Sequence, residues 1–366
     1  MRAAVLPEPG APLQIEEIAV PKPKRGEVLV KVTACGVCHT DLHVIKGEVA
    51  FPTPAVLGHE ISGTVAGLGE GVDAFEPGQP VLGTFIMPCG ACEACLAAHD
   101  DLCERFFAMN RLRGTLYDGE TRLFRQDGSP LAMYSMGGLA DYAVVPANGV
   151  FPAPTTVPPE EAAILGCAAM TAFGAITNGA DLRIGERVAV VATGGVGSLI
   201  VQFARAQGAL QVVAVDVGPE KLEAARKMGA TDTVDAGEGD PVERVLELTG
   251  GGADVVFEAL GHRETVLQAV EMLRDGGRLV CVGITPADVR VPIDITRLVR
   301  RGLRIQGSYG ARPRSDMPRL LALIERGVLH PDAAVTRRYT LDEAPEAYQA
   351  LDRREIVGRA IVTMGR

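Results

Sequence analysis

The chain has 366 residues, of which 47% are hydrophobic and 22% charged, and its formal net charge is −10. This length allows two domains, and the composition is that of an ordinary soluble globular protein. An acidic chain without a long Lys/Arg-rich run is not expected to bind nucleic acid. The N-terminus lacks an apolar stretch of signal-peptide length, and no run of about 18 apolar residues follows. We therefore expect a cytoplasmic protein with no membrane segment.

Short runs of β-branched residues fill the first 150 positions. Two of them, Glu27–Thr33 and Glu60–Ala66, are followed by turn signals such as Pro77-Gly78. This pattern predicts an all-β, partly open barrel rather than helices. A Pro-rich stretch at 151–159 then marks a change of architecture.

Four cysteines lie within this β-rich half in the spacing C-x2-C-x2-C-x7-C. They are Cys89, Cys92, Cys95 and Cys103. One loop can fold four thiolates at this spacing around a single ion, and tetrahedral zinc with four sulfur ligands has no open position, so the site would be structural. Two disulfides or an iron–sulfur cluster are the alternatives. Eight cysteines in a chain of this length favour a reducing compartment over a secreted disulfide framework.

From about residue 187, strand and helix patterns alternate. Apolar runs predict strands at Arg187–Ala192, Gln211–Asp216, Asp254–Phe257 and Arg278–Gly283, and helical periodicity predicts helices at Ser198–Gln207, Lys221–Met228 and Glu264–Leu273. Such alternation indicates a parallel sheet with helices on both faces. Beyond about residue 311 the alternation is not recognisable.

The turn after the first of these strands has the pattern of a dinucleotide-binding site. It matches G-x-G-x-x-G from position 192 to 197, with Ala192 in place of the first glycine. Gly194 would let the backbone approach a pyrophosphate, and Gly197 would let the following helix pack close to the strand. Asp216 ends the next strand, where a carboxylate accepts ribose hydroxyls and repels a 2′-phosphate, which favours NAD over NADP. A ligand-free tight turn and an ordinary strand-end acid are the alternatives.

A second group of metal-ligand type residues is spread along the chain. Cys38 lies in Cys35-Gly-Val-Cys38, His59 in Gly58-His59-Glu60, and Cys167 follows Gly166. Two thiolates and one imidazole would leave one zinc position open for water or substrate. Taken singly, each residue could instead be a packed core residue, and Cys35 with Cys38 could form a redox pair.

With these motifs the chain resembles the zinc-dependent medium-chain alcohol dehydrogenases over nearly its whole length. The stretch Arg113–Phe124 is similar to the liver-type branch. The resemblance implies an α/β protein with a GroES-like β-barrel catalytic domain at 1–168 and 308–366, carrying the structural zinc lobe at 89–103. It further implies a Rossmann domain with a doubly wound parallel sheet at 169–307, two zinc ions and NAD in each subunit, and a homodimer or homotetramer. The implied reaction is hydride transfer between NAD and a primary, secondary or aromatic alcohol, a small-molecule partner.

The resemblance also implies a role for each matching residue. Cys38, His59 and Cys167 match the catalytic zinc ligands, and Glu60 a carboxylate that can approach the metal. Asp41 matches the partner of His59, Thr40 the hydroxyl that bonds the alcohol, and His43 the outer end of the proton relay. The implied cofactor contacts are His39, Gly194, Gly195, Val196, Gly197, Asp216, Lys221, Val282, Ile284 and Arg359. For His43, Lys221 and Arg359, plain surface charge is the alternative.

By position, six residues would line the substrate pocket: Val49, Phe85, Ala108, Met133, Tyr134 and Ile284. This largely apolar wall suits a medium-sized hydrophobic or aromatic alcohol. Alternatively, some of these residues simply pack the barrel.

Two other functions are compatible with the same family. A thiol-dependent formaldehyde dehydrogenase would need cations at the pocket mouth. There Phe107 stands where the glutathione-using branch carries Arg, although Arg105 and Arg111 are close in sequence. A non-catalytic relative would lack a ligand or a relay residue, and here all of them are present.

Overall fold

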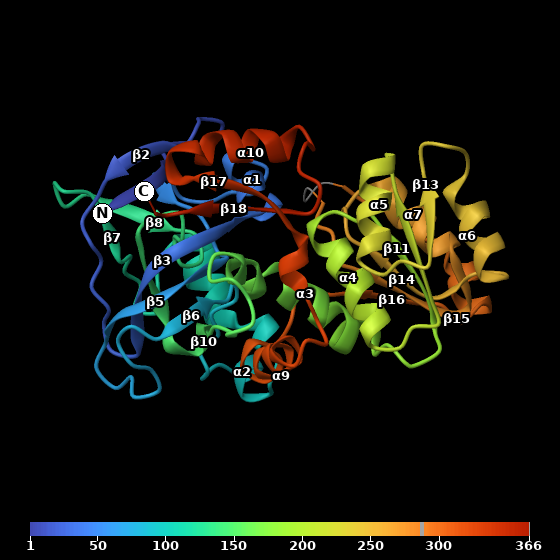
Figure 1. Ribbon diagram of the computed structural model, residues 1–366, viewed down its shortest axis with the longest axis horizontal. Helices are drawn as coiled ribbons and strands as arrows, with labels where there is room; N and C mark the ends of the chain where they lie inside the picture. The colour runs from blue at the N-terminus through green and yellow to red at the C-terminus, as the bar shows by residue number, and fades with distance from the viewer. Residues whose placement is uncertain (286–288, 366) are drawn as a thin grey trace. The chain divides into compact units, whose positions relative to one another are not determined.

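The structure is a computed structural model that describes residues 1–285 and 289–365. The chain forms two compact units. The barrel unit comprises Met1–Cys167 and Arg312–Arg366, and the parallel-sheet unit comprises Ala168–Ala311 (Figure 1). The barrel unit is therefore built from both ends of the chain, with the other unit inserted between them.

The barrel unit contains two sheets in its described residues. One has the order β2 (Gln14–Glu17), β1 (Arg2–Leu6), β4 (Ala55–Val56), β8 (Pro130–Met133) and β7 (Leu123–Phe124). The other has the order β10 (Val150–Pro152), β6 (Pro80–Gly83), β5 (Ile61–Leu68), β3 (Glu27–Val37), β18 (Arg359–Thr363) and β17 (Val335–Thr340), with β9 (Tyr142–Pro146) also paired to β3. The predicted β-barrel character of this half is confirmed.

Strand β3 is longer than the sequence pattern indicates. The alternating Val28, Val30 and Val32 bury one face of the strand, as expected for a strand with one face on the core. The strand continues past a register shift at Val32/Ala34 to Val37, because Cys35 pairs with Ile61 of β5 and Val37 with Ala360 of β18. It thereby delivers Cys38 to the end of the sheet, beside β5 and β18.

The barrel unit also contains helices and helical turns. In its described residues the α-helices are α1 (His39–Ile45), α2 (Glu93–Leu96), α9 (Pro313–Glu325) and α10 (Ala344–Asp352). A π-helical turn lies at Phe106–Arg111, and 3-10 turns lie at Asp100–Leu102, Ala147–Gly149, Glu161–Gly166, Pro331–Ala334 and Leu341–Glu343. The region beyond residue 311, where no alternation was recognisable, thus supplies two helices and two strands to the barrel unit.

The parallel-sheet unit has the strand order β13 (Asp232–Asp235), β12 (Gln211–Asp216), β11 (Arg187–Val191), β14 (Ala253–Glu258), β15 (Leu273–Cys281) and β16 (Arg304–Gly307), all parallel. Its helices are α3 (Ala168–Gly174) with the π-helical turn Ala175–Ala180, α4 (Gly195–Ala206), α5 (Pro219–Lys227), α6 (Pro241–Thr249), α7 (Arg263–Glu271) and α8 (Ile295–Arg300). This order, with two halves running outward from β11, is the doubly wound Rossmann arrangement. The predicted fold class is confirmed.

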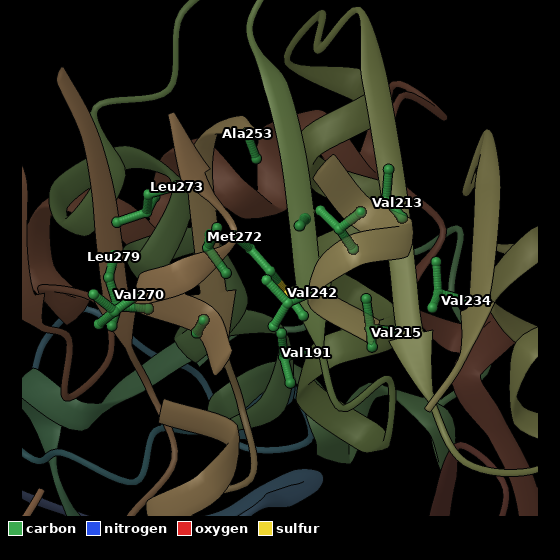
Figure 2. Close-up of a cluster of buried hydrophobic side chains, with 14 of the residues drawn as sticks. Val191, Val213, Val215, Val234, Val242, Ala253, Val270, Met272, Leu273 and Leu279 are labelled. Carbon is green, nitrogen blue, oxygen red and sulfur yellow. The ribbon is translucent and has the colours of Figure 1, made fainter. Parts of the chain in front are cut away.

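The core of this unit consists of aliphatic side chains from the strands and from the helices packed on them. Val191, Val213 and Val256 of the central strands meet Val245 of α6 and Ala269 of α7 in one buried cluster, part of which Figure 2 labels. Their continuous apolar runs are those expected of strands covered on both faces. Most bounds of the predicted elements differ from the structure by one to three residues, and β15 begins at Leu273, five residues before the predicted start at Arg278. Helix α7 ends at Glu271, because Leu273 is fully buried and pairs with Ala253 as the first residue of β15.

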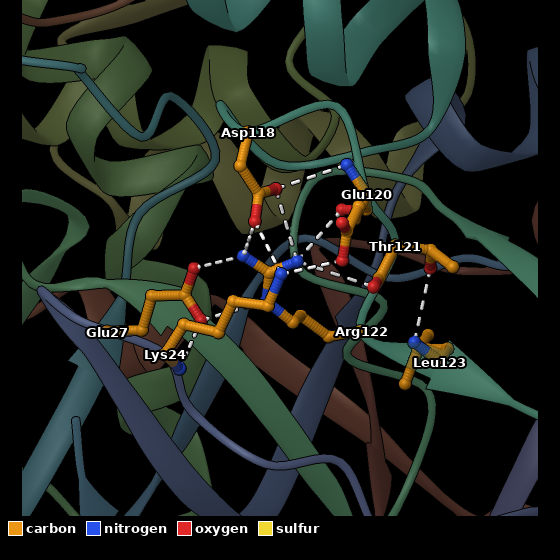
Figure 3. Close-up of polar contacts among 7 residues, drawn as sticks. All are labelled: Lys24, Glu27, Asp118, Glu120, Thr121, Arg122 and Leu123. Atoms are coloured by element: carbon orange, nitrogen blue, oxygen red, sulfur yellow. Dashed lines mark hydrogen bonds and ion pairs between the residues drawn. The ribbon is translucent and has the colours of Figure 1, made fainter.

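An ion-pair network around the buried Arg122 joins the start of β3 to the loop after the four-cysteine segment (Figure 3). Arg122 Nε and Nη2 donate to both oxygens of Glu27 at 2.9 and 2.6 Å, and Nη2 also donates to Asp118 at 2.9 Å. Lys24 Nζ donates to Asp118 at 2.7 Å. The bidentate geometry satisfies the buried guanidinium, and a charge buried in this way requires such a partner.

One helical stretch in the described chain, Glu161–Ala180, is long and apolar enough to cross a membrane by length and composition. Most of it, 83% of its test window, is buried inside the structure. The core helix of a soluble protein passes the same test, so this stretch is weak evidence for a membrane span.

Candidate functional site

The four cysteines of the C-x2-C-x2-C-x7-C segment converge on one point. All four sulfur atoms lie within 4.8 Å of one another, with Cys89 to Cys95 at 4.0 Å and Cys92 to Cys103 at 3.9 Å. A tetrahedron with zinc–sulfur bonds of about 2.3 Å has edges of about 3.8 Å, whereas a disulfide has sulfur atoms about 2.05 Å apart. All four cysteines are free. The arrangement therefore fits a single tetrahedral ion and excludes the disulfide alternative for this geometry.

Backbone geometry supports the same sulfur atoms. The amide groups of Ala91 and Cys92 donate to Cys89 Sγ at 3.4 and 3.3 Å, and the amide of Cys89 donates to Cys103 Sγ at 3.3 Å. Such N–H donors stabilise thiolate charge. The lobe is thus arranged to hold four negative sulfur ligands.

A second convergent group lies in the barrel unit at the end of β3. The ligand atoms of Cys38, His59, Glu60 and Cys167 all lie within 4.8 Å of one another, and all four residues are buried. His59 Nε2 and Glu60 Oε2 are buried and have no hydrogen-bond partner. Because an orphaned buried polar atom costs free energy, two of them beside two thiols fit a site that a cation completes.

The two thiols of this group differ in pKa. A hydrogen bond from Cys167 holds the pKa of Cys38 well below its usual range, and the same contact, together with burial, raises the pKa of Cys167. Burial raises the pKa of Glu60 to about 7 against the opposing charge of Arg359. Cys38 is therefore the thiol that ionises first.

A buried hydrogen-bond chain orients His59. Its Nδ1 donates to Asp41 Oδ1 at 3.0 Å, which leaves the lone pair of Nε2 directed into the metal group. Asp41 also accepts from the amide of Gly58 at 3.2 Å and from the hydroxyl of Tyr348 at 2.9 Å. Asp41 was identified from the sequence, whereas Tyr348 of α10 was not, because its partner lies 307 residues away.

Arg359 lies deeper than expected for a cofactor contact. It is only 5% exposed, and its Nη2 forms an ion pair with Glu60 Oε1. Strand β18 brings it there through the pairing of Ala360 with Val37. Its Nε is buried without a partner. The plain surface-charge alternative is therefore wrong for Arg359; its predicted contact with the pyrophosphate stays a prediction.

The predicted relay residues occupy helix α1. Thr40 is half-buried with its hydroxyl 3.5 Å from Cys38 Sγ, and His43 Nδ1 lies 2.5 Å from Glu48 Oε2. His39 is exposed. In the described part of the chain no hydrogen bond joins Thr40 directly to His43.

The predicted pocket residues divide into two groups. The Phe85 and Tyr134 rings lie 4.7 and 6.0 Å from the His59 ring, measured between centroids, and both are buried, as is Met133. Val49 is half-buried and Ala108 exposed. Ile284 belongs to the parallel-sheet unit, where it is 47% exposed. Within the barrel unit, the structure therefore brings Phe85 and Tyr134 to the metal group.

The glycine turn of the parallel-sheet unit joins β11 to α4. A Cβ at Gly197 would lie 1.9 Å from the Ala192 carbonyl oxygen, so only glycine fits there, and a Cβ at Gly194 would meet nothing within 4 Å. Ala192 itself adopts φ +69°, a left-handed conformation that costs a non-glycine residue about 1 kcal/mol. Gly195 and Val196 begin α4, and its free N–H groups face the turn. The turn thus has the open face and the helix start of a phosphate-binding site.

Asp216 lies at the end of β12 beside this turn. Its carboxylate accepts from the amide of Thr193 at 2.6 Å and from the amide of Val217 at 2.7 Å, and Lys221 Nζ lies 3.4 Å away. The two backbone donors fix the carboxylate, and its weaker side-chain contacts can give way to a ligand. Asp216 is therefore more than an ordinary surface acid at a strand end.

Glu258, at the end of β14, was not recognised from the sequence. It is fully buried and accepts from the amides of Leu260 and Gly261 and from Thr265. Its backbone carbonyl accepts from the amide of Val282, a predicted cofactor contact. In the sequence, the only sign of a role for Glu258 is that a charged residue ends an apolar strand. Through these hydrogen bonds Glu258 organises the loop at the carboxyl edge of the sheet, where ligands of such sheets bind.

Two family models match this chain. Residues 24–155 match the family model of the alcohol dehydrogenase GroES-like domain, and residues 195–326 match that of the zinc-binding dehydrogenases. An S-(hydroxymethyl)glutathione dehydrogenase from Escherichia coli is 35% identical, over 96% of each chain.

Solved structures agree over the full length. An alcohol dehydrogenase zinc-binding domain protein from Burkholderia ambifaria superimposes with a TM-score of 0.94 at 33% identity, covering 100% of this chain and 99% of the other. Benzyl alcohol dehydrogenase from Acinetobacter calcoaceticus gives 0.93 at 30% identity, with the same coverage. With both metal-ligand groups and the glycine turn in place, the chain belongs to the zinc-dependent medium-chain alcohol dehydrogenase family.

Proposed function

We propose that this enzyme oxidises a primary, secondary or aromatic alcohol to its aldehyde or ketone with NAD, or runs the reverse reaction, at the Cys38–His59–Cys167 group. The observation that carries the proposal is the orphaned Nε2 of His59, buried beside two thiols and oriented by Asp41. Zinc, when bound there, supplies a Lewis acid that polarises the alcohol oxygen, and NAD accepts the hydride. The four-cysteine lobe would hold a second, structural zinc.

Residues of helix α1 would transfer the proton of the alcohol hydroxyl to solvent. The Thr40 hydroxyl, 3.5 Å from Cys38 Sγ, would accept the hydrogen bond of the alcohol hydroxyl. His43 is partly exposed and pairs with Glu48, so it can pass a proton to solvent. Glu60 would approach the metal when no substrate is present, with Arg359 balancing its charge otherwise.

The parallel-sheet unit would bind NAD. Gly194, Gly195, Val196 and Gly197 would receive the pyrophosphate at the start of α4, and Asp216 with Lys221 the adenosine ribose. Val282 and Ile284 would contact the nicotinamide half, and His39 and Arg359 the phosphates. Asp216 favours NAD because its carboxylate repels a 2′-phosphate.

We assign the catalytic function to residues 1–168 and 308–366 and cofactor binding to 169–307. A cytoplasmic homodimer or homotetramer is the proposed state of the enzyme, with neither nucleic acid nor a membrane as a partner.

A second candidate is oxidation of the formaldehyde–glutathione adduct. It is favoured by the name of the relatives that are 35% identical, S-(hydroxymethyl)glutathione dehydrogenase. Against it stands Phe107, at the position where the sequence comparison expects the arginine of that branch.

The test is NADH formation from NAD with a panel of primary, secondary and aromatic alcohols. Formaldehyde is included with and without glutathione, and every assay is repeated with NADP. Turnover of alcohols without thiol supports the main proposal, and turnover only with formaldehyde plus glutathione supports the second. Absence of turnover in a protein that holds two zinc ions would contradict both.

Cys38→Ala locates the reaction. We expect loss of alcohol oxidation by at least about a thousandfold and loss of one of two zinc ions per chain, measured by metal analysis. Cys281→Ala removes a half-buried cysteine of the parallel-sheet unit outside both metal groups and serves as the matched control. Substantial activity in Cys38→Ala would show that the assigned group is not the catalytic one.

A further inference from the structure

Arg111 is a half-buried cation with a donor that nothing accepts. It ends the π-helical turn Phe106–Arg111, just after the four-cysteine lobe. Its Nη1 is buried and has no hydrogen-bond partner among the described residues. Its guanidinium carbon lies 4.1 Å from the Tyr134 ring centroid and 5.6 Å from that of Phe85. The cation–π contacts stabilise the charge, but they leave the buried N–H group unsatisfied.

The most deeply buried arginines of the described chain differ from Arg111 in having a carboxylate partner. Three arginines that are less than 9% exposed, Arg122, Arg278 and Arg359, each pair with a carboxylate, and these are Glu27, Glu186 and Glu60 respectively. Since burial of an unpaired charge is costly, pairing is the usual solution. Arg111 has no such ion pair within residues 1–285 and 289–365. Its guanidinium therefore contacts two aromatic rings but has no carboxylate partner in the described chain.

The position of Arg111 relates it to the metal group. The rings of Phe85 and Tyr134 that carry the guanidinium also contact the ring of His59, at centroid distances of 4.7 and 6.0 Å. One aromatic ring thus lies between Arg111 and a ligand of the proposed catalytic zinc. All four residues belong to the barrel unit. A small substrate bound at the metal group would have Arg111 beside its distal end.

We propose that Arg111 binds a carboxylate of the substrate, so that the preferred substrates are hydroxy acids, alcohols bearing a carboxylate remote from the reacting carbon, or the corresponding aldehydes. The inference rests on the proposed alcohol oxidation at the Cys38–His59–Cys167 group. The planar guanidinium matches a carboxylate in geometry, with parallel N–H donors for its two oxygens. The aromatic rings beneath it would contact the apolar part that joins carboxylate to alcohol.

The surroundings favour a monocarboxylate over a phosphate. One guanidinium balances one negative charge, whereas a dianion would require a second cation at the same place. The nearest arginines in sequence, Arg105 and Arg113, are exposed to solvent. An aromatic floor also matches the apolar body of an aryl or alkyl acid better than a strongly hydrated anion.

The experiment compares two alcohols that differ only in the carboxylate, 4-(hydroxymethyl)benzoate and benzyl alcohol. The readout is the ratio of their kcat/KM values in each enzyme. We expect the wild type to favour the acid. In Arg111→Met the ratio should fall about 10- to 100-fold, mainly through KM of the acid, because one charged hydrogen-bond contact is lost. Methionine keeps an apolar chain over the rings, and Arg111→Lys should restore part of the preference.

Arg113→Met is the matched control, because it removes the same charge from an exposed arginine two positions away. It should keep the wild-type ratio. An equal fall in both methionine variants would mean that overall charge, and not Arg111, attracts the acid, and would overturn the assignment.

Binding of 4-methylbenzoate, measured by titration calorimetry on the zinc-loaded protein, separates this inference from the proposed function. An approximately tenfold weaker Kd in Arg111→Met than in wild type and Arg113→Met supports the carboxylate site, even if no alcohol is oxidised and the proposed function fails. Equal Kd values, with alcohols oxidised and the substrate ratio unchanged, overturn the Arg111 assignment and leave alcohol oxidation intact.

Discussion

At the scale of single residues, the metal group depends on side chains that the sequence does not place together. Asp41 could be predicted as the partner of His59 from the family motif, because both lie in short conspicuous segments. Tyr348 could not, since a tyrosine on an amphipathic helix is indistinguishable from an ordinary core residue until the helix is placed. The structure shows its hydroxyl donating to Asp41 Oδ2 at 2.9 Å, with both side chains buried.

Tyr348→Phe tests this positioning role. Removal of the hydroxyl leaves one oxygen of buried Asp41 without its donor, which loosens the carboxylate that orients His59. We expect the affinity of the catalytic site for zinc to fall about three- to tenfold, less than the 10- to 100-fold typical of a direct partner. Competition with a chromogenic chelator measures this without any turnover.

Tyr339→Phe provides the control, because the hydroxyl of that tyrosine in β17 accepts from Arg337 and forms no hydrogen bond with Asp41 in the described chain. If Tyr348→Phe retained zinc as tightly as Tyr339→Phe and wild type, Tyr348 would be a packing residue and nothing more.

At the scale of elements, the four-cysteine lobe is anchored by a helix from the far end of the chain. Arg314 of α9 donates through its backbone amide to Asp100 at 3.0 Å and through Nη2 to the same carboxylate at 2.6 Å. The guanidinium also donates to the carbonyl of Cys95. Asp100 is 1% exposed. Helix α9 therefore fixes the lobe from outside, independently of the metal inside it.

Asp100→Ala should destabilise the barrel unit. It removes the carboxylate from Arg314, and because that arginine is partly exposed we expect a loss of about 2 kcal/mol in the free energy of unfolding, below the value for a fully buried pair. Denaturant titration measures this loss, and a colorimetric thiolate-zinc release assay should show faster loss of the structural ion. Asp73→Asn, a change at an exposed acid, should alter neither quantity. Equal stability in Asp100→Ala would mean that the metal alone holds the lobe.

Elements with strong local patterns were predictable, and those defined by remote partners were not. The strand Gln211–Asp216 was predicted to the residue, because its apolar run is uninterrupted and Asp216 ends it. Strand β18 and helix α10 were not predicted. Their short apolar patterns are ambiguous in the sequence, and their structure depends on partners in β3 and the metal group that are remote in sequence. Ala192 shows a further limit: its left-handed backbone is imposed by the turn, against the residue's own preference.

At the scale of the whole molecule, both metal-ligand groups found in the described residues belong to the barrel unit. The parallel-sheet unit has its own buried cluster of valine, leucine, alanine and methionine side chains, and all of its described members belong to that unit. Ligand spacing, together with the family resemblance, was sufficient to predict the residues of both metal-ligand groups. It was not sufficient to find Arg111 and Glu258, whose significance lies in what surrounds them.

Metal removal should therefore act unequally on the two units. After dialysis against a strong chelator, hydrogen–deuterium exchange followed by mass spectrometry should show faster exchange in peptides from 27–167 and 335–363. Peptides from β11, β12 and β14 should keep their protection, because their burial does not involve a metal ligand. A uniform rise in exchange across both ranges would mean that the units unfold as one cooperative body.

The pairing of β18 with β3 has a consequence for how the protein is made. During synthesis, residues 1–167 leave the ribosome first, with one edge of β3 lacking the strand that will cover it. The parallel-sheet unit, whose residues are contiguous, can fold next. Only when Tyr348 and Arg359 emerge, after the whole parallel-sheet unit, do Asp41 and Glu60 gain these partners. The Cys38–His59–Cys167 group thus gains its surrounding partners only after the parallel-sheet unit has been synthesised, and a chain that terminates before β18 leaves an open strand edge available for aggregation.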